Sequence, residues 1–523
     1  MNPAPVSRRS FLSGSASVAA LAAMAQIPAF ESAAAAPAIP GGGYPFRLGV
    51  ASGSPQPDGV VLWTRLVPDL FVAGGGMPRR KVPVDWKVAT DPGMHHVVRH
   101  GSAWALPQLA HSVHVQLRGL RPDRDYFYQF RYRQDVTEVA HTRTAPNPRA
   151  PIGSLAFAAA SCQKWDDGYY SAYRAMAEED IDFVLHLGDY VYEYGIDRNG
   201  GHRETPVPAV LGPSPVDLPR WRMQYELHKS DPQLQLTHRR FPFVVTWDDH
   251  EVSNDYANTH DFSGDIAARR AAAYQAWYEH MPVWAAANPK GAPPRIYGRM
   301  SWGDLMQIHV LDGRQYRDIP PCGWGEAQAC EAAYDPAISM LGRRQENWLY
   351  DGLRRSDAQW TVLGSNVMMA RLDHDGDLGD LLWNDAWDGF PEARNRLSRQ
   401  IVQAGVRNPM VLSGDWHSTF VNDIRKDFDK PGSPVIATEF VGTSISSNGD
   451  TPIYGPYYGP MIKFNPHIKF FDGDRRGYQL YNVDRQQWRT DLRMVRSVAT
   501  PGAADYTYAS FVVRDGTPGA VRV

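Results

Sequence analysis

The 523-residue sequence lacks the features by which several functional classes are recognised. It has only three cysteines, so at most one disulfide can form within the chain. Its formal net charge is −3 and its basic and acidic residues are well mixed, without a basic block or an aromatic–basic stripe. We therefore expect no dedicated nucleic-acid surface. No serine lies in a G-x-S-x-G elbow, which disfavours a serine hydrolase.

The N-terminal segment has the pattern of an export signal. Ser7 to Leu12 reads SRRSFL, a twin-arginine pattern, and a mild apolar run follows from Ala16 to Ala25. This run is too short and too alanine-rich for a stable membrane span, and no later stretch approaches one. We therefore expect residues 1–36 to be a twin-arginine signal peptide, with the mature chain starting near Pro37 and carrying no transmembrane segment. The expected localisation is periplasmic or secreted, and the expected partner during export is the twin-arginine translocase.

Residues 44–147 have the short alternating stretches of an all-β domain, and long helical patterns are missing there. Gly59 to Thr64 and Val82 to Val88 are two of these stretches. Leu120 to Tyr128 has the spacing L-x-P-x-x-x-Y-x-Y, which resembles the tyrosine corner of fibronectin type III domains. We therefore predict an immunoglobulin/fibronectin III-like β-sandwich, ending in the proline-rich linker at residues 144–151.

Residues 150–515 alternate strand-like and helix-like patterns. The expected helices include residues 169–179, 265–278 and 342–355, and the expected strands include residues 305–311, 361–368, 410–412 and 508–513. This alternation predicts a second, larger domain of the α/β class, with helices on both faces of the sheet.

Acidic, histidine and cysteine residues follow four of the apolar runs in this second domain. They lie in the sequences ASCQ (Ala160 to Gln163), HLGDYVYEYG (His186 to Gly195), TWDDHE (Thr246 to Glu251) and SGDWH (Ser413 to His417). One aspartate after a strand is usually a turn or a helix cap. Four such segments place carboxylates, imidazole and a thiol at the carboxyl ends of strands, where open α/β sheets bind ligands. The set therefore predicts a metal site.

These motifs resemble those of a known enzyme family. GDxxY is similar to the iron-binding segment of purple acid phosphatases, and DDHE and GDWH stand where metallophosphoesterases generally have GNHE and GHxH. The whole set resembles the alkaline phosphatase D (PhoD-like) family of metallophosphoesterases. The resemblance implies a four-layer (α-β-β-α) catalytic fold, with ferric iron and calcium as the metals. Because Asp415 replaces a histidine and Cys162 lies near the first family motif, we do not expect the usual all-imidazole metal pair.

The resemblance assigns roles residue by residue. The expected iron ligands are Cys162, Asp189, Tyr192 and His417, with Asp189 bridging to the second metal. The expected calcium ligands are Asp249, Asn254 and Asp415, whose oxygen atoms suit a hard cation. His250 resembles the histidine that stabilises the transferred phosphoryl group, so it and Asp189 are the expected catalytic residues. The spacing alone does not exclude zinc.

Several residues keep two interpretations at this point. Cys162 is a ligand or a small buried apolar residue, Asn254 is a ligand or a turn residue, and Asp248 contacts the metal directly or through its neighbours. An arginine of segment 312–317 binds phosphate or forms a structural ion pair. The aromatic segment 383–390 lines the pocket or packs on the core, and Cys322 and Cys330 are predicted to pair in an oxidising compartment.

We therefore expect an exported alkaline phosphatase that hydrolyses small phosphomonoesters and phosphodiesters by attack of a metal-activated hydroxide or oxide on phosphorus. Two alternatives stay open: a phospholipase D-like phosphodiesterase on the same fold, and a secreted binding protein with an inert catalytic domain.

Overall fold

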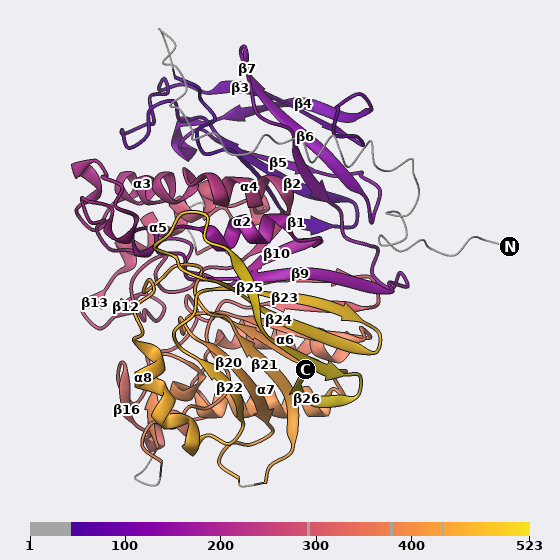
Figure 1. Cartoon of the computed structure of the whole chain (residues 1–523), viewed down its shortest axis with the longest axis vertical. Helices are drawn as coiled ribbons and strands as arrows, with labels where there is room; N and C mark the ends of the chain where they lie inside the picture. The colour runs from indigo at the N-terminus through magenta and orange to yellow at the C-terminus, as the bar shows by residue number, and fades with distance from the viewer. Residues whose placement is uncertain (1–42, 290–292, 377–379, 431) are drawn as a thin grey trace, which may run out of the picture. The chain divides into compact units, whose positions relative to one another are not determined.

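The structure is a computed structural model that describes residues 43–289, 293–376, 380–430 and 432–523. The predicted signal peptide, including its two arginines, lies outside these residues. Strands are the main regular structure, and most of them form two large sheets and one smaller sheet (Figure 1). No helix within the described ranges is long and apolar enough to cross a membrane.

The largest sheet has ten strands in the order β26-β25-β24-β23-β9-β10-β11-β1-β2-β5. Its strands β9, β10 and β11 are parallel neighbours, and β1 is in turn parallel to β11. The bounds are β1 Val50–Gln56, β2 Gly59–Arg65, β5 Ser112–Leu117, β9 Ser154–Ala160, β10 Phe183–His186, β11 Pro242–Val245, β23 Gly477–Asp484, β24 Gln487–Val495, β25 Asp505–Arg514 and β26 Thr517–Arg522.

The second sheet has seven strands in the order β14-β15-β17-β19-β21-β20-β22, of which β15, β17, β19 and β21 are parallel. The bounds are β14 Gly298–Trp302, β15 Met306–Val310, β17 Trp360–Ser365, β19 Pro409–Ser413, β20 Thr419–Arg425, β21 Val435–Val441 and β22 Ile468–Asp472. Two small hairpin-like pairs lie outside it: β12 His260–Asp261 with β13 Gly264–Asp265, and β16 Glu326–Gln328 with β18 Leu381–Trp383.

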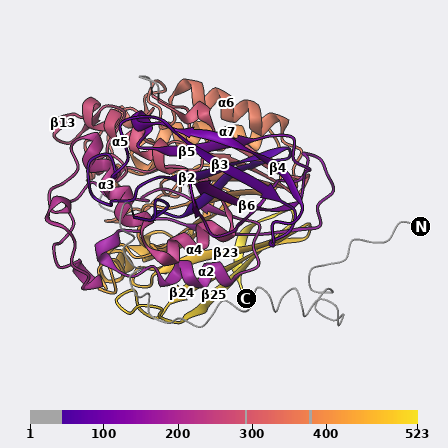
Figure 2. The same cartoon turned by 90° about the horizontal axis from the view of Figure 1, so that it is seen from above.

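The N-terminal part has a five-stranded sheet of its own, which faces the viewer in Figure 2. It consists of β3 Val82–Ala89, β4 Val97–Ala105, β6 Asp125–Tyr132, β7 Asp135–Val136 and β8 Ala140–Arg143. An apolar cluster joins it to β1, β2 and β5. The predicted tyrosine corner forms, because the Tyr126 hydroxyl accepts a hydrogen bond from the Arg121 backbone N–H at 2.9 Å.

The N-terminal part is continuous with the rest of the fold, since β1, β2 and β5 extend the ten-stranded sheet through the pairing of β1 with β11. This explains why β2 is buried along its whole length, although a surface strand would alternate. Val60 and Leu62 face the five-stranded sheet, whereas Trp63 packs on the opposite side. The boundary predicted at residues 147–150 stays a prediction, because the described chain from Tyr44 onward forms one compact unit.

The helices pack on the large sheets in two groups. Their bounds are α2 Ser171–Glu178, α3 Leu218–Lys229, α4 Pro232–Arg240, α5 Ala267–His280, α6 Gly342–Arg355, α7 Pro391–Gln403 and α8 Tyr454–Tyr458. Local signals start two of them: Asp217 caps α3, and Asp231 caps α4 immediately before a proline at the first helical position. Helices α2 to α5 share an apolar cluster with β9, β10 and β11, whereas α6 and α7 share one with β17 and β19.

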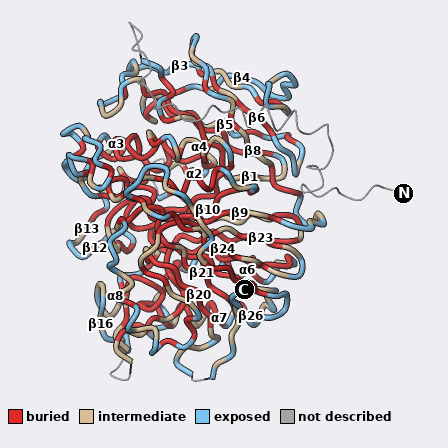
Figure 3. The backbone as a smooth tube through the Cα atoms, in the orientation of Figure 1, coloured by how far each residue is buried: buried red, intermediate tan, exposed pale blue. Residues whose placement is uncertain are grey.

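A third apolar cluster lies between the two large sheets. It joins Phe157 and Leu185 of the ten-stranded sheet to Ile308, Val362 and Leu412 of the seven-stranded sheet. The strands are accordingly buried along most of their length (Figure 3). Because both faces of β9, β10 and β11 are covered, these strands are continuous apolar runs, and their first polar residues come where the strands end.

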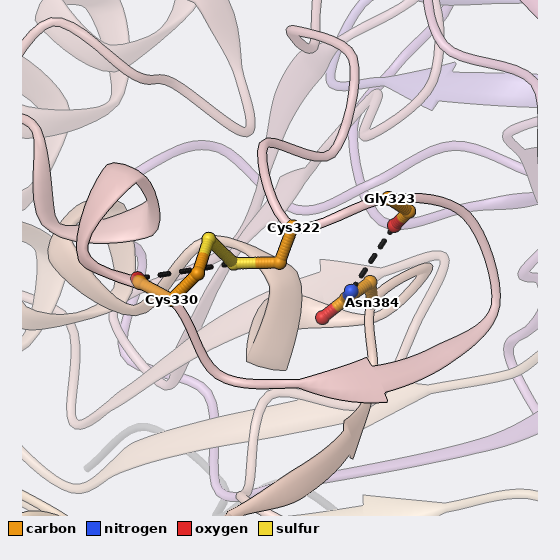
Figure 4. Close-up of a disulfide and its surroundings, with 4 residues drawn as sticks. All are labelled: Cys322, Gly323, Cys330 and Asn384. Carbon is orange, nitrogen blue, oxygen red and sulfur yellow. Dashed lines mark hydrogen bonds between the residues drawn. A yellow bond between two sulfur atoms is a disulfide. The ribbon is translucent and has the colours of Figure 1, made fainter.

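The predicted disulfide is present between Cys322 and Cys330 (Figure 4). It closes a loop whose Gly323 carbonyl accepts a hydrogen bond from the Asn384 amide at 3.0 Å, which joins the loop to the segment after β18. Cys162 is left as a buried free thiol.

Candidate metal centre

Most of the predicted ligands follow the carboxyl ends of four strands: β9, β10 and β11 of the ten-stranded sheet and β19 of the seven-stranded sheet. His186, the last residue of β10, is in register with Ala160 of β9 and Val245 of β11. Cys162, Asp189 and Asp249 follow these strands by two to four residues and therefore lie at the same edge. Asp415 and His417 come after β19 of the second sheet.

The side chains from these strand ends converge. Three groups of candidate ligands have their ligand atoms within 4.8 Å of one another. They are Cys162 with Asp189 and His417, Asp189 with Asp249 and His250, and Asp248 with Asp249 and Asp415. Asp189 belongs to the first two groups and Asp249 to the last two, so the three candidate groups are adjacent. The bridging role expected for Asp189 stays a prediction.

The backbone at four of these residues is left-handed. Cys162, Asp189, Asp415 and His417 have φ of 59°, 56°, 70° and 48°, respectively. Residues other than glycine rarely adopt this conformation, and such strain is concentrated at functional sites.

The glycine before Asp189 is required by close approach. Gly188 has φ 112°, and a Cβ added to it would lie 2.4 Å from Asp248 Cβ and 2.7 Å from the Asp248 backbone nitrogen. The β10 and β11 loops can therefore touch only because this position has no side chain. This contact accounts for the Gly–Asp pair of the motif.

Tyr192 lies beside the first ligand group. Its buried hydroxyl is 3.1 Å from Asp189 Oδ2, 3.1 Å from His417 Nε2 and 2.6 Å from Ser447 Oγ. The phenol oxygen is thus next to two of the three side chains with which it is predicted to bind iron. Ser447 was not foreseen, because only the folded chain brings the segment after β21 to this place.

Asn254 forms its hydrogen bonds with two residues outside the three ligand groups. Its Oδ1 accepts a hydrogen bond from the half-exposed Tyr194 hydroxyl at 3.5 Å, and its backbone N–H donates to Glu193 Oε1 at 2.8 Å. The side chain is therefore directed to the solvent-facing side of the site. Both interpretations of Asn254, as a metal ligand and as a turn residue, therefore stay open.

Arg314 is the main feature that the sequence did not resolve. Its fully buried guanidinium donates to Asp248 Oδ1 at 2.5 Å, to both oxygens of Asp385 at 2.6 and 2.7 Å, and to Asp415 Oδ1 at 3.0 Å. Arg317 also donates to Asp385. Both arginines of segment 312–317 are thus held in ion pairs, the structural alternative to phosphate binding. Asp248 is therefore both a member of the third ligand group and an ion-pair partner of Arg314.

His250 forms a pair with Glu193 that sequence reasoning missed. His250 Nδ1 is 2.8 Å from Glu193 Oε2. Burial lowers the pKa of His250, but the charges of Glu193, Asp249 and Asp189 outweigh it and raise this pKa well above its usual value. Glu193 therefore fixes the orientation of the imidazole and favours its protonated form. Glu193 follows Tyr192 directly in the quoted motif, so its proximity in sequence was the available signal.

Glu251 holds the two aspartate loops together. Its carboxylate accepts hydrogen bonds from the backbone N–H groups of Asp189, Tyr190 and Asp248 at 3.0, 2.7 and 2.8 Å. This glutamate is the last residue of the DDHE motif, and it contacts only backbone in these interactions. Its role is thus to fix the two loops relative to each other.

The protonation states suit a centre that is completed by cations. Burial and the charge of Asp189 raise the pKa of the Cys162 thiol well above its usual value, and burial and Asp189 do the same for the Tyr192 phenol. Both groups stay neutral unless a positive charge stabilises the anion. Burial lowers the pKa of His417 to about 3, so its imidazole is a neutral donor.

Unpartnered carboxylate oxygens provide a direct test of whether a cation fits. Asp189 Oδ1 and Asp248 Oδ2 are buried and have no hydrogen-bond partner among the described residues, and Asp249 Oδ1 has no hydrogen bond there but lies 3.4 Å from Arg314 Nη2 in an ion pair. A buried carboxylate oxygen without a donor is costly, and buried charges are normally paired or bound to metal. The donor set of carboxylate, thiol, phenol and imidazole therefore fits cations between these side chains.

Ligand groups of this kind at the carboxyl ends of parallel strands are characteristic of metal-dependent hydrolases, and the comparisons narrow this class. The model of the PhoD-like phosphatase family matches residues 157–492, and that of the PhoD-like phosphatase N-terminal domain matches residues 32–146. Alkaline phosphatase D of Bacillus subtilis (strain 168) is 41% identical over 528 residues, covering 99% of this chain and 89% of that protein. A solved structure described as the structure of PhoD matches with a TM-score of 0.87 and 41% identity, covering 93% of both chains.

The chain belongs to the PhoD-like phosphatase family, and it is an enzyme of the phosphoric ester hydrolase class. The family resemblance drawn from the four motifs is thereby confirmed.

Proposed function

We propose that this protein is an exported, metal-dependent alkaline phosphatase that hydrolyses phosphomonoesters and phosphodiesters. The observation that carries the proposal is the set of three candidate ligand groups joined through Asp189 and Asp249, with His250, held by Glu193, in the middle group. When bound, the cations neutralise the phosphoryl oxygens and supply the nucleophile for attack on phosphorus. The name of the Bacillus subtilis relative supports the substrate class.

We infer that His250, which lies in the middle ligand group, assists the departure of the alcohol. Its Nδ1 is engaged by Glu193, which leaves Nε2 as the donor toward the reacting phosphate or the leaving oxygen. A positioned acid of this kind contributes about 10²- to 10⁴-fold to the rate. Glu193 keeps the imidazole charged and correctly turned, so it is a positioning residue.

The proposed metals are ferric iron and calcium. Iron would be held by Cys162, Asp189, Tyr192 and His417, because thiolate and phenolate are strongly donating anionic ligands. Calcium would be held on the side of Asp249, Asn254 and Asp415, because carboxylate and amide oxygens suit a hard cation. Metal analysis of protein purified after native export tests this assignment, and a stoichiometric content of zinc with no iron would contradict it.

We also propose the finer description of the fold: an immunoglobulin/fibronectin III-like sandwich at residues 44–147, and a four-layer α-β-β-α catalytic domain at residues 150–515. Three apolar clusters support the layering. One lies between helices α2 to α5 and the ten-stranded sheet, one between the two large sheets, and one between the seven-stranded sheet and helices α6 and α7. The Tyr126 hydrogen bond supports the sandwich.

Export by the twin-arginine translocase is proposed from the sequence of residues 1–36, and it suits a cofactor inserted before export. Replacing Arg8 and Arg9 by lysine should stop export, because this pair is the feature that the pathway recognises. The measurement is the amount of mature enzyme in the periplasmic fraction. Undiminished export of the double variant would contradict the assignment.

The activity is tested with metal-loaded enzyme on p-nitrophenyl phosphate and on its bis ester. Turnover of both supports the proposal, whereas no turnover of either would favour an inert binding protein. Release of free choline from phosphatidylcholine, in preference to both esters, would favour the phospholipase D-like alternative.

The role of His250 is tested by the variant His250→Gln. It should lose about 10²-fold or more on an alkyl phosphate, but much less on p-nitrophenyl phosphate, whose leaving group needs no proton. Equal losses on both substrates would show that His250 does not assist the leaving group.

A further inference from the structure

Two tyrosines stand next to the two histidines of the metal centre. The ring of Tyr194 is 5.5 Å from that of His250, and the ring of Tyr454 is 6.0 Å from that of His417. Tyr192 lies between the histidines, with its ring 4.3 Å from His250 and 6.4 Å from His417. These contacts connect the five rings, and Tyr194 and Tyr454 are each next to one of the two histidines.

Exposure increases from the ligands toward these two ends. Cys162 and Asp189 are 0% and 1% exposed, whereas the Tyr194 residue is 42% exposed. Tyr454 is partly exposed, and it begins α8 within the long segment between β21 and β22. The accessible side of the centre is therefore bordered by Tyr194 near His250 and by Tyr454 near His417.

Both phenols lie within the electrostatic reach of the ligand groups. Burial raises the pKa of the Tyr454 phenol, and the carboxylate of Asp415 raises it further. Burial also raises the pKa of the Tyr194 phenol, with added contributions from Glu193 and from Asp249. Both tyrosines offer the apolar, polarisable faces of their rings to a bound ligand.

Both rings are held in place by other aromatic rings. Tyr454 stacks on Tyr458 at 5.6 Å, and Tyr458 in turn contacts Trp416 at 5.1 Å. Tyr194 stacks on Tyr192 at 6.5 Å. Rings fixed in this way lose little further freedom when a ligand binds, so most of the contact energy is retained as affinity.

Buried carboxylates and the buried Arg314 occupy one side of the ligand groups. The alcohol group of a bound phosphate ester would therefore extend toward the more exposed side, where Tyr194 and Tyr454 lie beside the histidines. Aromatic side chains favour planar aromatic groups by stacked or edge-to-face contacts beyond simple apolar burial.

We propose that Tyr194 and Tyr454 form a specificity-determining subsite for the alcohol group of the substrate, and that this subsite selects esters with a planar aromatic group over aliphatic esters of the same size. This inference rests on the proposed function, because it concerns the substrate class of the same site. It assigns the two tyrosines to binding, with no part in the proton or phosphoryl transfer.

The test uses two non-hydrolysable probes that differ only in the ring: benzylphosphonate and cyclohexylmethylphosphonate. Each is measured as a competitive inhibitor of the metal-loaded enzyme acting on methyl phosphate. The parent enzyme should bind benzylphosphonate about five-fold more tightly, the equivalent of one favourable ring contact. In Tyr194→Leu and Tyr454→Leu this preference should fall toward equality, whereas Tyr194→Phe and Tyr454→Phe should keep it.

Tyr457→Leu is the matched control. Tyr457 lies on the same helix and is 43% exposed, but its hydroxyl binds Glu326, and its ring contacts His374 and Tyr458 rather than a histidine of the centre. This variant should keep the preference of the parent. Equal inhibition by the two probes in the parent, or a preference unchanged in both leucine variants, would overturn the subsite.

The same experiment separates the two proposals. Methyl phosphate has no ring, so its turnover and its inhibition by inorganic phosphate report on the metal centre alone. Turnover of methyl phosphate without discrimination between the probes would remove the subsite and leave the proposed function intact. No turnover by the metal-loaded parent would overturn both.

Discussion

The buried Lys229 provides a prediction about stability and pH. It ends α3 and is 1% exposed, and its amino group lies 4.4 Å from the ring centroid of Trp63 and 5.2 Å from that of Tyr190. Burial lowers its pKa from 10.5 to about 7, and no carboxylate in the described part of the chain forms an ion pair with it. The change to test is Lys229→Met, which keeps the length and apolar stem of the side chain.

The sign follows from the two pKa values. Between pH 7 and about 10.5 the unfolded chain carries a proton on this lysine that the folded chain has lost, so folding stability rises with pH in this window. The difference corresponds to about 5 kcal/mol at about 1.36 kcal/mol per pH unit. The ring faces of Trp63 and Tyr190 favour the charged form by about 1–2 kcal/mol, which leaves a net cost of about 3–4 kcal/mol below pH 7.

The assay is urea unfolding of the parent and of Lys229→Met from pH 6 to pH 10, with metals present at the same concentration. The variant should be the more stable protein at pH 6, and its advantage should shrink by about 1.4 kcal/mol per pH unit above the pKa in the folded state. Lys87→Met, at an exposed lysine, is the control and should show no such trend. A constant difference between the parent and Lys229→Met across this range would refute the reasoning.

Three further predictions concern the centre and the disulfide. Arg314→Met should destabilise metal-free protein by about 3–5 kcal/mol, because it leaves buried carboxylates uncompensated, and Arg314→Lys should recover part of the loss in thermal unfolding. Tyr192→Phe should keep the fold but shift or weaken the visible absorption of iron-loaded enzyme and lower its turnover; an unchanged spectrum at full iron content would remove the phenol from the metal. Thiol titration of denatured, unreduced protein should find one reactive cysteine, Cys162, and breaking the disulfide should cost about 2–3 kcal/mol; three reactive thiols would contradict this.

The elements that could be predicted are those with a local signal. The helix at residues 342–355 has its predicted bounds, because its amphipathic pattern, the left-handed Gly342 and the terminal arginines all lie within the segment. The strand ends that carry Asp189 and Asp415 were predicted because apolar runs stop abruptly at a Gly–Asp pair. The expected terminal strand is β25, and a further strand, β26, follows it where the sequence has no apolar run.

The contacts that could not be predicted join residues far apart in the sequence. Arg314 and Asp385 are 71 positions apart, and Glu193 and His250 are 57 apart. Nothing near Arg314 distinguishes a phosphate ligand from a partner of buried aspartates, because both need an arginine at the end of a strand. The pairing of β1 with β11 escaped prediction for the same reason, since strand patterns do not specify neighbours.

The side chains of the centre have energetic costs that the described residues alone do not offset. Four ligand positions have left-handed backbone, at a cost of about 1–3 kcal/mol each. Two buried carboxylate oxygens lack hydrogen-bond donors among the described residues, a third is held only by an ion pair with Arg314 at 3.4 Å, and the cluster contains more carboxylates than Arg314 and His250 can balance. A fold selected for stability alone would replace these residues with apolar ones or add donors. Both kinds of cost occur at the same few residues, and Glu251 and Arg314 hold these residues in place. The strain is therefore best explained by a requirement to keep anionic side chains close together for binding cations.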